Sequence, residues 1–238
     1  METFDDSDIG RVLAVAAHPD DMEYGGSAAV ARWTAAGVDV SYALVTSGEA
    51  GMDSVPPDEA GPLREAEQRA ACAAVGVEDV TFLGFADGTV EYGLGLRRAI
   101  AERVRRTRPD LVITGSFRET WPGGYVNQSD HVAVGRAALD AVRDAGNRWV
   151  FSEQLAAGLE PWNGVRTVLA LASPDSTHAI VVDETFEHAV RSLEAHAAYL
   201  AALGDGTTNA RDVLEQVLGS MGPKVGARYA VAAEVFRM

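Results

Sequence analysis

The chain has 238 residues, enough for one substantial α/β domain or two small ones, and 47% of them are hydrophobic, as in an ordinary globular protein. The formal net charge of −15 argues against nucleic acid or an anionic membrane as a partner, because both repel an acidic protein. The first residues lack the basic and apolar regions of a signal peptide, and no apolar run approaches the roughly 20 residues of a membrane span. We therefore expect a cytoplasmic protein. Cys72 is the only cysteine, which excludes intrachain disulfides and thiolate zinc clusters.

Strands and helices alternate along the chain. The apolar and alternating runs predict strands at 11–17, 38–46, 80–83, 111–114, 149–155, 167–171, 179–183 and 227–236. Helical spacing and end signals predict helices at 27–33, 63–75, 94–107, 130–145, 184–203 and 210–219. Residues 52–61 are predicted to form a surface loop and residues 1–9 a flexible N-terminal segment. Without an internal repeat or linker, we expect one domain over 1–238.

This alternation predicts a doubly wound, mainly parallel α/β sheet of the Rossmann-like kind, with helices on both faces. Such sheets usually place their first strand at the centre, between the second and the fourth. The carboxyl ends of strands 11–17 and 111–114 should then flank the crevice where open α/β sheets bind their ligands.

The run His18-Pro19-Asp20-Asp21 follows the first strand directly. Pro19 cannot donate to a sheet and favours an extended conformation at His18, so the strand must end here, before two glycines lead into a helix. The second feature is the long loop 115–129, which ends at Asp130-His131 after the fourth strand. The topology should therefore bring together the side chains of His18, Asp20, Asp21, Asp130 and His131.

Two histidines and a carboxylate, with one position open to water, make a catalytic zinc site, and a second carboxylate beside the metal can act as general base. The alternative is that His18 and one of the two aspartates merely cap the following helix. Nucleophilic catalysis has little support, because the chain has no G-x-S-x-G sequence and Cys72 has no local histidine partner. The first turn also lacks the G-x-G-x-x-G and Walker sequences of nucleotide-binding proteins.

These residues match a known family. The HPDD run, with Glu23 and the Gly-Gly helix start, resembles the LmbE-like, or PIG-L, zinc-dependent de-N-acetylases, which include the deacetylases of the mycothiol and bacillithiol pathways. Weaker similarities extend over nearly the whole chain. They comprise the T-x-G-x-x-G turn at 46–51, R-x-x-E at 64–67, Arg-Pro-Asp at 108–110, Asp130-His131 as the end of H-P-D-H, A-L-x-x-H over 193–196 and A-E-x-F at 233–236.

The resemblance implies roles for individual residues. It implies His18, Asp21 and His131 as zinc ligands and Asp20 as the general base. It implies Arg64 as a substrate contact, for which a solvated helix charge is the alternative. Asp130 would support the site or cap its helix.

Gln128 is the main departure, because it stands where the family usually has the first histidine of H-P-D-H. An amide can donate a hydrogen bond to an oxyanion but cannot deliver a proton. Protonation of the leaving group would then fall to Asp20 or to water. Trp121 and Tyr125 in the same loop could stack on a sugar or another ring, with packing inside the loop as the alternative.

The resemblance implies a zinc-dependent hydrolase of a linear amide that removes the acetyl group from an N-acetylated amino sugar or its glycoside. Ferrous iron remains open as the metal, because two histidines and an aspartate serve either ion. The alternatives are an amidase or tailoring deacetylase acting on a thiol conjugate or secondary metabolite, and, because of Gln128, a non-catalytic metal- or sugar-binding relative. The expected partner is a small N-acyl amino sugar or related metabolite, and the family suggests a homo-oligomer.

Overall fold

The computed structural model describes residues 1–203 and 209–238, and an eight-stranded sheet in the order β1-β7-β8-β6-β5-β2-β3-β4 forms its centre. The strands are β1 (Glu2–Thr3), β2 (Arg11–Ala16), β3 (Asp39–Leu44), β4 (Asp79–Phe82), β5 (Leu111–Gly115), β6 (Thr167–Leu171), β7 (His178–Val181) and β8 (Ala230–Arg237). All pairs are parallel except those of β8, which runs antiparallel to β6 and β7. The predicted mainly parallel α/β fold is confirmed.

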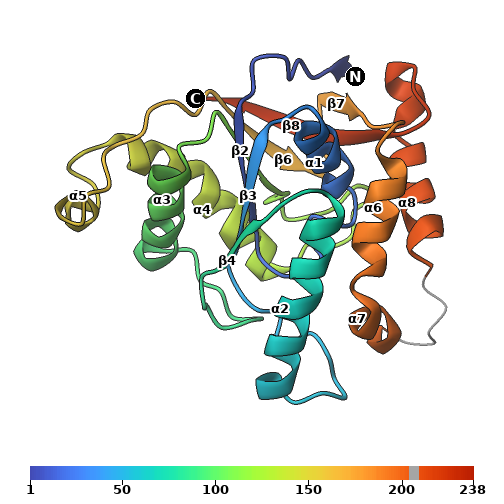
Figure 1. Ribbon diagram of the computed structural model, residues 1–238, viewed down its shortest axis with the longest axis horizontal. Helices are drawn as coiled ribbons and strands as arrows, with labels where there is room; N and C mark the ends of the chain where they lie inside the picture. The colour runs from blue at the N-terminus through green and yellow to red at the C-terminus, as the bar shows by residue number, and fades with distance from the viewer. Residues whose placement is uncertain (204–208) are drawn as a thin grey trace.

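Helices cover both faces of this sheet, as expected (Figure 1). They are α1 (Gly26–Ala35), α2 (Pro57–Ala74), α3 (Leu94–Thr107), α4 (Ser129–Gly146), α5 (Ser152–Ala156), α6 (Phe186–Glu194), α7 (Ala197–Ala202), α8 (Ala210–Gly219) and the 3-10 helix η1 (Gly222–Val225). Alternate residues of β2 explain the two layers, because Val12 and Ala14 pack in the core under α1, α6 and α8, while Leu13 and Val15 pack under α3 and α4. In the described ranges, no helix combines the length and the apolar character that a bilayer span requires.

The central position of the first long strand is also confirmed. β2 pairs with β3 on one side, with Val12 opposite Val40, and with β5 on the other, with Val12 opposite Leu111. The turn after β2 and the loop after β5 therefore leave the sheet at the same edge, side by side.

The predicted strand at 149–155 is wrong. The segment forms turns followed by α5 and lies away from the sheet (Figure 1). The cause is Arg105, which is buried and donates hydrogen bonds to the backbone carbonyls of Asn147, Val150 and Phe151, and also to the side chain of Gln154. A chain that gathers its carbonyls around one guanidinium group must curl, so it cannot extend along a neighbouring strand.

The helix predicted over 184–203 is two helices, α6 and α7, and α7 ends at Ala202. The break falls at Ala195 and His196. Glu67 Oε1 accepts a hydrogen bond from the backbone N–H of Ala198 at 2.6 Å, so a carboxylate from α2 satisfies the start of α7.

Two segments predicted to lack regular secondary structure contain part of a helix and a short strand. The helix α2 begins at Pro57 inside the predicted loop, because proline suits the first helical position and Asp58 and Glu59 favour the positive end of the helix dipole. In the N-terminal segment 1–9, β1 pairs with the start of β7.

Candidate metal centre

The turn after β2 brings the HPDD side chains to the carboxyl edge of the sheet. The run ends the strand at Ala16, and Asp20 adopts a left-handed conformation with a φ of 82°. Asp21 Oδ2 accepts a hydrogen bond from the backbone N–H of His18 at 2.8 Å, which closes the turn. His131, on the first turn of α4, arrives at the same place from the far end of the loop that follows β5.

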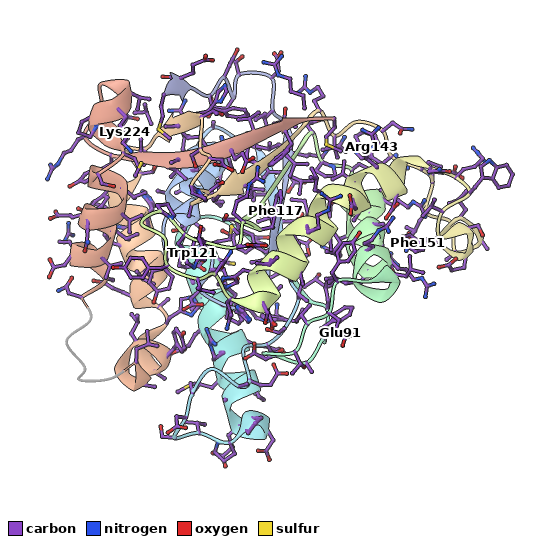
Figure 2. All side chains as sticks on the ribbon, turned by 180° about the vertical axis from the view of Figure 1, so that it is seen from behind. Glu91, Phe117, Trp121, Arg143, Phe151 and Lys224 are labelled. Carbon is purple, nitrogen blue, oxygen red and sulfur yellow. The ribbon has the colours of Figure 1, made fainter. Side chains whose placement is uncertain are left out.

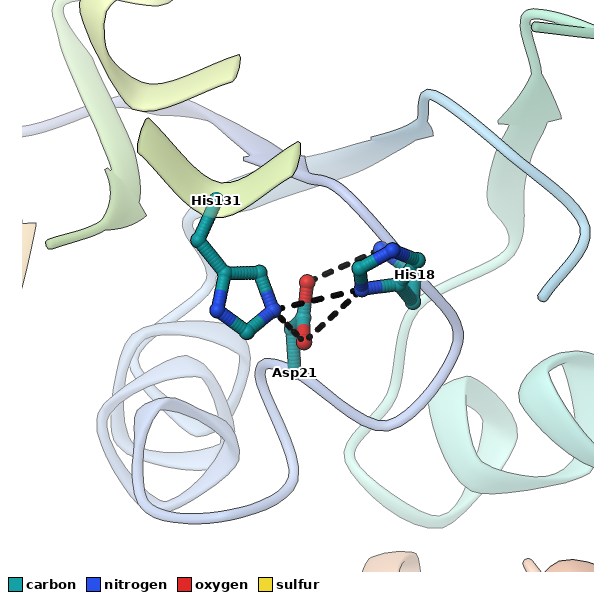
Figure 3. Close-up of side chains that lie close together, drawn as sticks. All are labelled: His18, Asp21 and His131. Carbon is teal, nitrogen blue, oxygen red and sulfur yellow. Dashed lines mark hydrogen bonds and ion pairs between the residues drawn. The ribbon is translucent and has the colours of Figure 1, made fainter. Parts of the chain in front are cut away.

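Three donor atoms from these two segments converge (Figure 3). His131 Nε2 lies 3.0 Å from Asp21 Oδ1 and 3.2 Å from His18 Nδ1. His18 Nδ1 lies 3.6 Å from the same oxygen of Asp21. The three predicted metal ligands are therefore together, although His131 lies more than a hundred positions after His18 and Asp21.

The outward nitrogen of His18 faces two carboxylates. His18 Nε2 lies 3.0 Å from Asp87 Oδ1 and 3.4 Å from Asp130 Oδ2. Asp130 is completely buried, and its two oxygens accept hydrogen bonds from the backbone N–H groups of Gly88 and Val90. The helix α4 has no side-chain cap, so Asp130 supports His18 and the neighbouring loop rather than capping its own helix.

The outward nitrogen of His131 is held by Asn127. His131 Nδ1 lies 3.1 Å from Asn127 Oδ1. The amide group of Asn127 can be oriented only this way, because its Nδ2 donates to the backbone carbonyls of Ser116 and Arg118. His131 therefore donates its Nδ1 proton and presents the lone pair of Nε2 to the centre.

This arrangement suits a cation. Since both rings donate their outward protons, the two nitrogens that face each other carry lone pairs and repel one another unless positive charge lies between them. Burial lowers the pKa of His18, but the Asp21 and Asp87 carboxylates on either side of the ring raise it to about 10, so the negative charge around the ring favours a cation here. Burial raises the pKa of Asp21, but the adjoining rings of His131 and His18 hold it well below its ordinary value. The donor set fits zinc or ferrous iron.

Asp20 lies beside this centre in a buried polar pocket. Arg64 Nη2 donates to Asp20 Oδ1 at 3.1 Å and to the carbonyl of Pro19 at 2.6 Å. Burial raises the pKa of the Asp20 carboxyl well above its usual range, although Arg64 opposes this shift. Gln68 Oε1 accepts the backbone N–H of Asp20, which stabilises its left-handed conformation.

Arg64 itself is only 2% exposed, so the alternative of a solvated helix charge is wrong. Its guanidinium carbon lies 3.8 Å from the centre of the Tyr199 ring, and Nη1 donates to the carbonyl of Gly48. Arg64 holds the HPDD turn against the loop after β3, and its contact with substrate remains a prediction.

The loop 115–129 places its three predicted residues differently. Trp121 lies edge-on to His131, with ring centroids 5.6 Å apart, and lines a cavity of about 640 Å³ that also has Asp21 and His131 in its wall. Tyr125 is 76% exposed just after the tip of a hairpin, where its carbonyl accepts a hydrogen bond from the backbone N–H of Trp121. Gln128 is exposed immediately before α4, and its backbone N–H donates to Asn127 Oδ1 at 2.8 Å.

Two residues of the site escaped sequence reasoning, Asp87 and Asn127. Asp87 lies in an Asp-Gly pair after β4, a common turn sequence, although the rule that sends loops after parallel strands to one edge could have included it. Asn127 lies four residues before His131, within an irregular loop whose course no periodic pattern predicts.

Comparisons with known proteins identify relatives of this chain. Residues 13–142 match the family model described as PIG-L, GlcNAc-PI de-N-acetylase. A 1D-myo-inositol 2-acetamido-2-deoxy-alpha-D-glucopyranoside deacetylase of Acidothermus cellulolyticus is 31% identical over 243 residues, 82% of each chain. The solved N,N'-diacetylchitobiose deacetylase of Pyrococcus horikoshii superposes with a TM-score of 0.88 and 22% identity, covering 97% of this chain and 85% of that one.

The fold alone also occurs with another reaction. The 4-carboxy-2-hydroxymuconate hydratase of Pseudomonas putida superposes with a TM-score of 0.78 at 16% identity, over 96% of both chains. The sequence match over more than half of the chain is therefore the stronger finding. This chain belongs to the PIG-L family of GlcNAc-PI de-N-acetylases.

Proposed function

We propose that this protein is a zinc-dependent hydrolase that removes the acetyl group from an N-acetylated amino sugar or from a glycoside of one. The observation that carries the proposal is the convergence of His18 Nδ1, Asp21 Oδ1 and His131 Nε2, with the outward nitrogen of each ring engaged by an oxygen. The activity named for the Acidothermus relative supports the choice of reaction. Ferrous iron is the alternative metal, since the same donors bind it.

A divalent cation held by these three residues would polarise the acetyl carbonyl and lower the pKa of a water molecule beside it. Asp20 accepts a proton from the attacking water while the oxygen of that water bonds to the acetyl carbonyl carbon. The C–N bond then breaks, and Asp20 returns the proton to the departing nitrogen, so that a free amine and acetic acid result, and the acid loses its proton to solvent as acetate. Arg64 keeps the Asp20 carboxylate in position throughout.

Three residues of the loop 115–129 complete the proposal. Gln128, at the exposed start of α4, donates a hydrogen bond to the oxyanion of the tetrahedral intermediate. Trp121 offers a flat aromatic surface beside His131 on which a sugar ring can stack. Tyr125, exposed just after the tip of the hairpin, contacts the part of the substrate that extends out of the cavity.

The decisive variant is Asp20→Asn, assayed for acetate release from N-acetylglucosamine and its methyl glycoside together with metal content. Loss of the base should lower kcat by about 10²- to 10⁴-fold while the metal stays bound, because the three ligands are untouched. Asp39→Asn, which changes an exposed carboxylate at the opposite edge of the sheet, is the matched control and should behave as wild type.

Other results would point elsewhere. If Asp20→Asn hydrolysed the substrate as well as wild type, Asp20 would not be the base. Metal binding by wild type without acetate release from any amino sugar would favour an amidase for a thiol conjugate or secondary metabolite if other amides were cleaved. If none were cleaved, it would favour a non-catalytic binding protein.

A further inference from the structure

The cavity beside the metal centre is much longer than the reaction needs. Its wall begins at Asp21, Trp121 and His131 and crosses the carboxyl ends of β2, β5 and β6 to β8, where α8 and η1 cover it. Three steps between neighbouring strands of about 4.8 Å each make this path roughly 14 Å long. Trp121 and Lys224 line the two ends of the cavity, and both lie in the left half of the molecule in Figure 2.

The middle of the cavity is apolar. Its wall there consists of aliphatic and thioether side chains, among them Met22, Leu171, Val217, Leu218, Val231 and Ala232. Charged side chains of the described residues enter the lining only at the ends, with Asp21 and His131 at one and Lys224 at the other.

The serine hydroxyls in the wall are already engaged with the protein. Ser173 donates to Glu234 at 2.7 Å, Ser176 to the carbonyl of Ser173 at 2.6 Å, and Ser220 to the carbonyl of Val217 at 2.8 Å. By contrast, Thr114 Oγ1, near the metal centre, is buried and has no partner in the described part of the chain. Free hydrogen-bonding capacity of the side chains in the wall therefore lies at Thr114, near the metal centre, and at Gln216 and Lys224, at the end covered by α8 and η1, with little between them.

A sugar ring is a poor occupant of such a wall, because each hydroxyl that loses water without gaining a partner costs free energy. The methyl group of an acetyl would fill only a small part of about 640 Å³. We propose that the cavity binds an unbranched apolar chain of the substrate, carried either as an alkyl aglycone or as an acyl group longer than acetyl. This inference rests on the proposed function, because it places the reacting amide at the metal centre.

The test compares matched substrates. One arm sets the octyl against the methyl glycoside of N-acetylglucosamine, and the other sets N-octanoyl against N-acetyl on the methyl glycoside. Burial of one methylene is worth about fourfold in affinity, so the arm that uses the cavity should gain at least about tenfold in kcat/KM. The arm that gains identifies which part of the substrate carries the chain.

Two variants locate the chain in the cavity. Ala232→Trp, on β8, should fill the cavity and abolish the gain while leaving the methyl glycoside of N-acetylglucosamine nearly unaffected, whereas Ala232→Ser should keep the gain. Val217→Asp on α8 is a second variant, chosen because its position is 39% exposed and tolerates a polar side chain even if Ala232→Trp fails to fold. The charge of the new aspartate in the cavity wall should also abolish the gain.

Binding separates this inference from the proposed function. If the chain is carried as the aglycone, the octyl glycoside of glucosamine, which has no acyl group to hydrolyse, should bind wild type at least about tenfold more tightly than the methyl glycoside in calorimetry. Tight binding without any acetate release would overturn the proposed reaction and leave the apolar site standing. Equal binding of the two glycosides, with no gain in either kinetic arm, would overturn the apolar site alone.

Discussion

The metal centre and the apolar cavity share a wall, but they are built in opposite ways. In the metal centre, each imidazole nitrogen that turns outward has its own oxygen partner, from Asp87 and Asp130 for His18 and from Asn127 for His131. In the cavity, packing sets the shape, and the serine hydroxyls of the wall donate to neighbouring protein groups.

This difference separates reactivity from selectivity. Hydrogen bonds fix the position of a side chain to a fraction of an ångström and also fix its orientation. Metal ligation and proton transfer require both. Apolar walls are non-directional and respond to size, so they can change between relatives without disturbing the chemistry. We therefore expect substitutions in the centre to lower turnover for every substrate, and substitutions in the cavity to change only which substrate is preferred.

The largest effect should come from the centre itself. His131→Ala removes one of the three donors, so we expect the purified protein to lose its metal and acetate release to fall below detection. Metal analysis and the acetate assay measure both, with His188→Ala, an exposed histidine of α6, as the control. A variant that kept one metal per chain and full turnover would remove His131 from the site.

Gln128 tests whether the departure from the family motif matters. Gln128→Ala removes the proposed oxyanion donor and should lower kcat by about 10²-fold or more, with KM little changed. Gln128→His restores the residue usual in the family and should keep or raise kcat, because an imidazole can both donate and deliver a proton. Unchanged kcat in Gln128→Ala would mean that the exposed amide has no part in the reaction.

The topology was the predictable part of this site. Once β2 and β5 are neighbours in a parallel sheet, His18 and His131 must leave it at the same edge, although 113 positions separate them. That inference needs only strand patterns and a general rule of winding, and it does not depend on how any loop folds.

The residues that hold the centre were harder to predict, because their contacts are specific and distant. Apart from the family resemblance, the sequence pattern shows Arg64 as one more charge on an alanine-rich helix, and its burial against Asp20 appears only in the structure. Arg105 likewise shows no sign in the sequence that it will gather the carbonyls after α4 and prevent a strand there. Side-chain hydrogen bonds to distant backbone leave no periodic trace in a sequence.

Asp87 should show an intermediate effect. Asp87→Asn weakens the acceptor for His18 Nε2, so the ring is held less firmly in the tautomer that presents Nδ1 to the metal. We expect metal affinity to fall by about 10- to 100-fold, measured by competition with a chelator, with kcat nearly restored at saturating metal. Asp79→Asn, at a half-exposed position at the start of β4, is the control. Unchanged affinity would show that Asp130 alone is enough to orient His18.

The smallest effect should come from the wall that the centre and the cavity share. A Cβ added at Gly135 of α4 would lie 2.8 Å from the backbone oxygen of Gly115, at the end of β5, so the helix would have to move away from the strand. We expect Gly135→Ala to lower the free energy of unfolding in urea by about 1–3 kcal/mol. Because His131 lies one turn earlier on α4, kcat/KM should also fall a few-fold. Gly95→Ala on α3, where a Cβ meets nothing within 4 Å, should be neutral or stabilising. If Gly135→Ala were as stable and as active as wild type, the approach of α4 to β5 would not position His131.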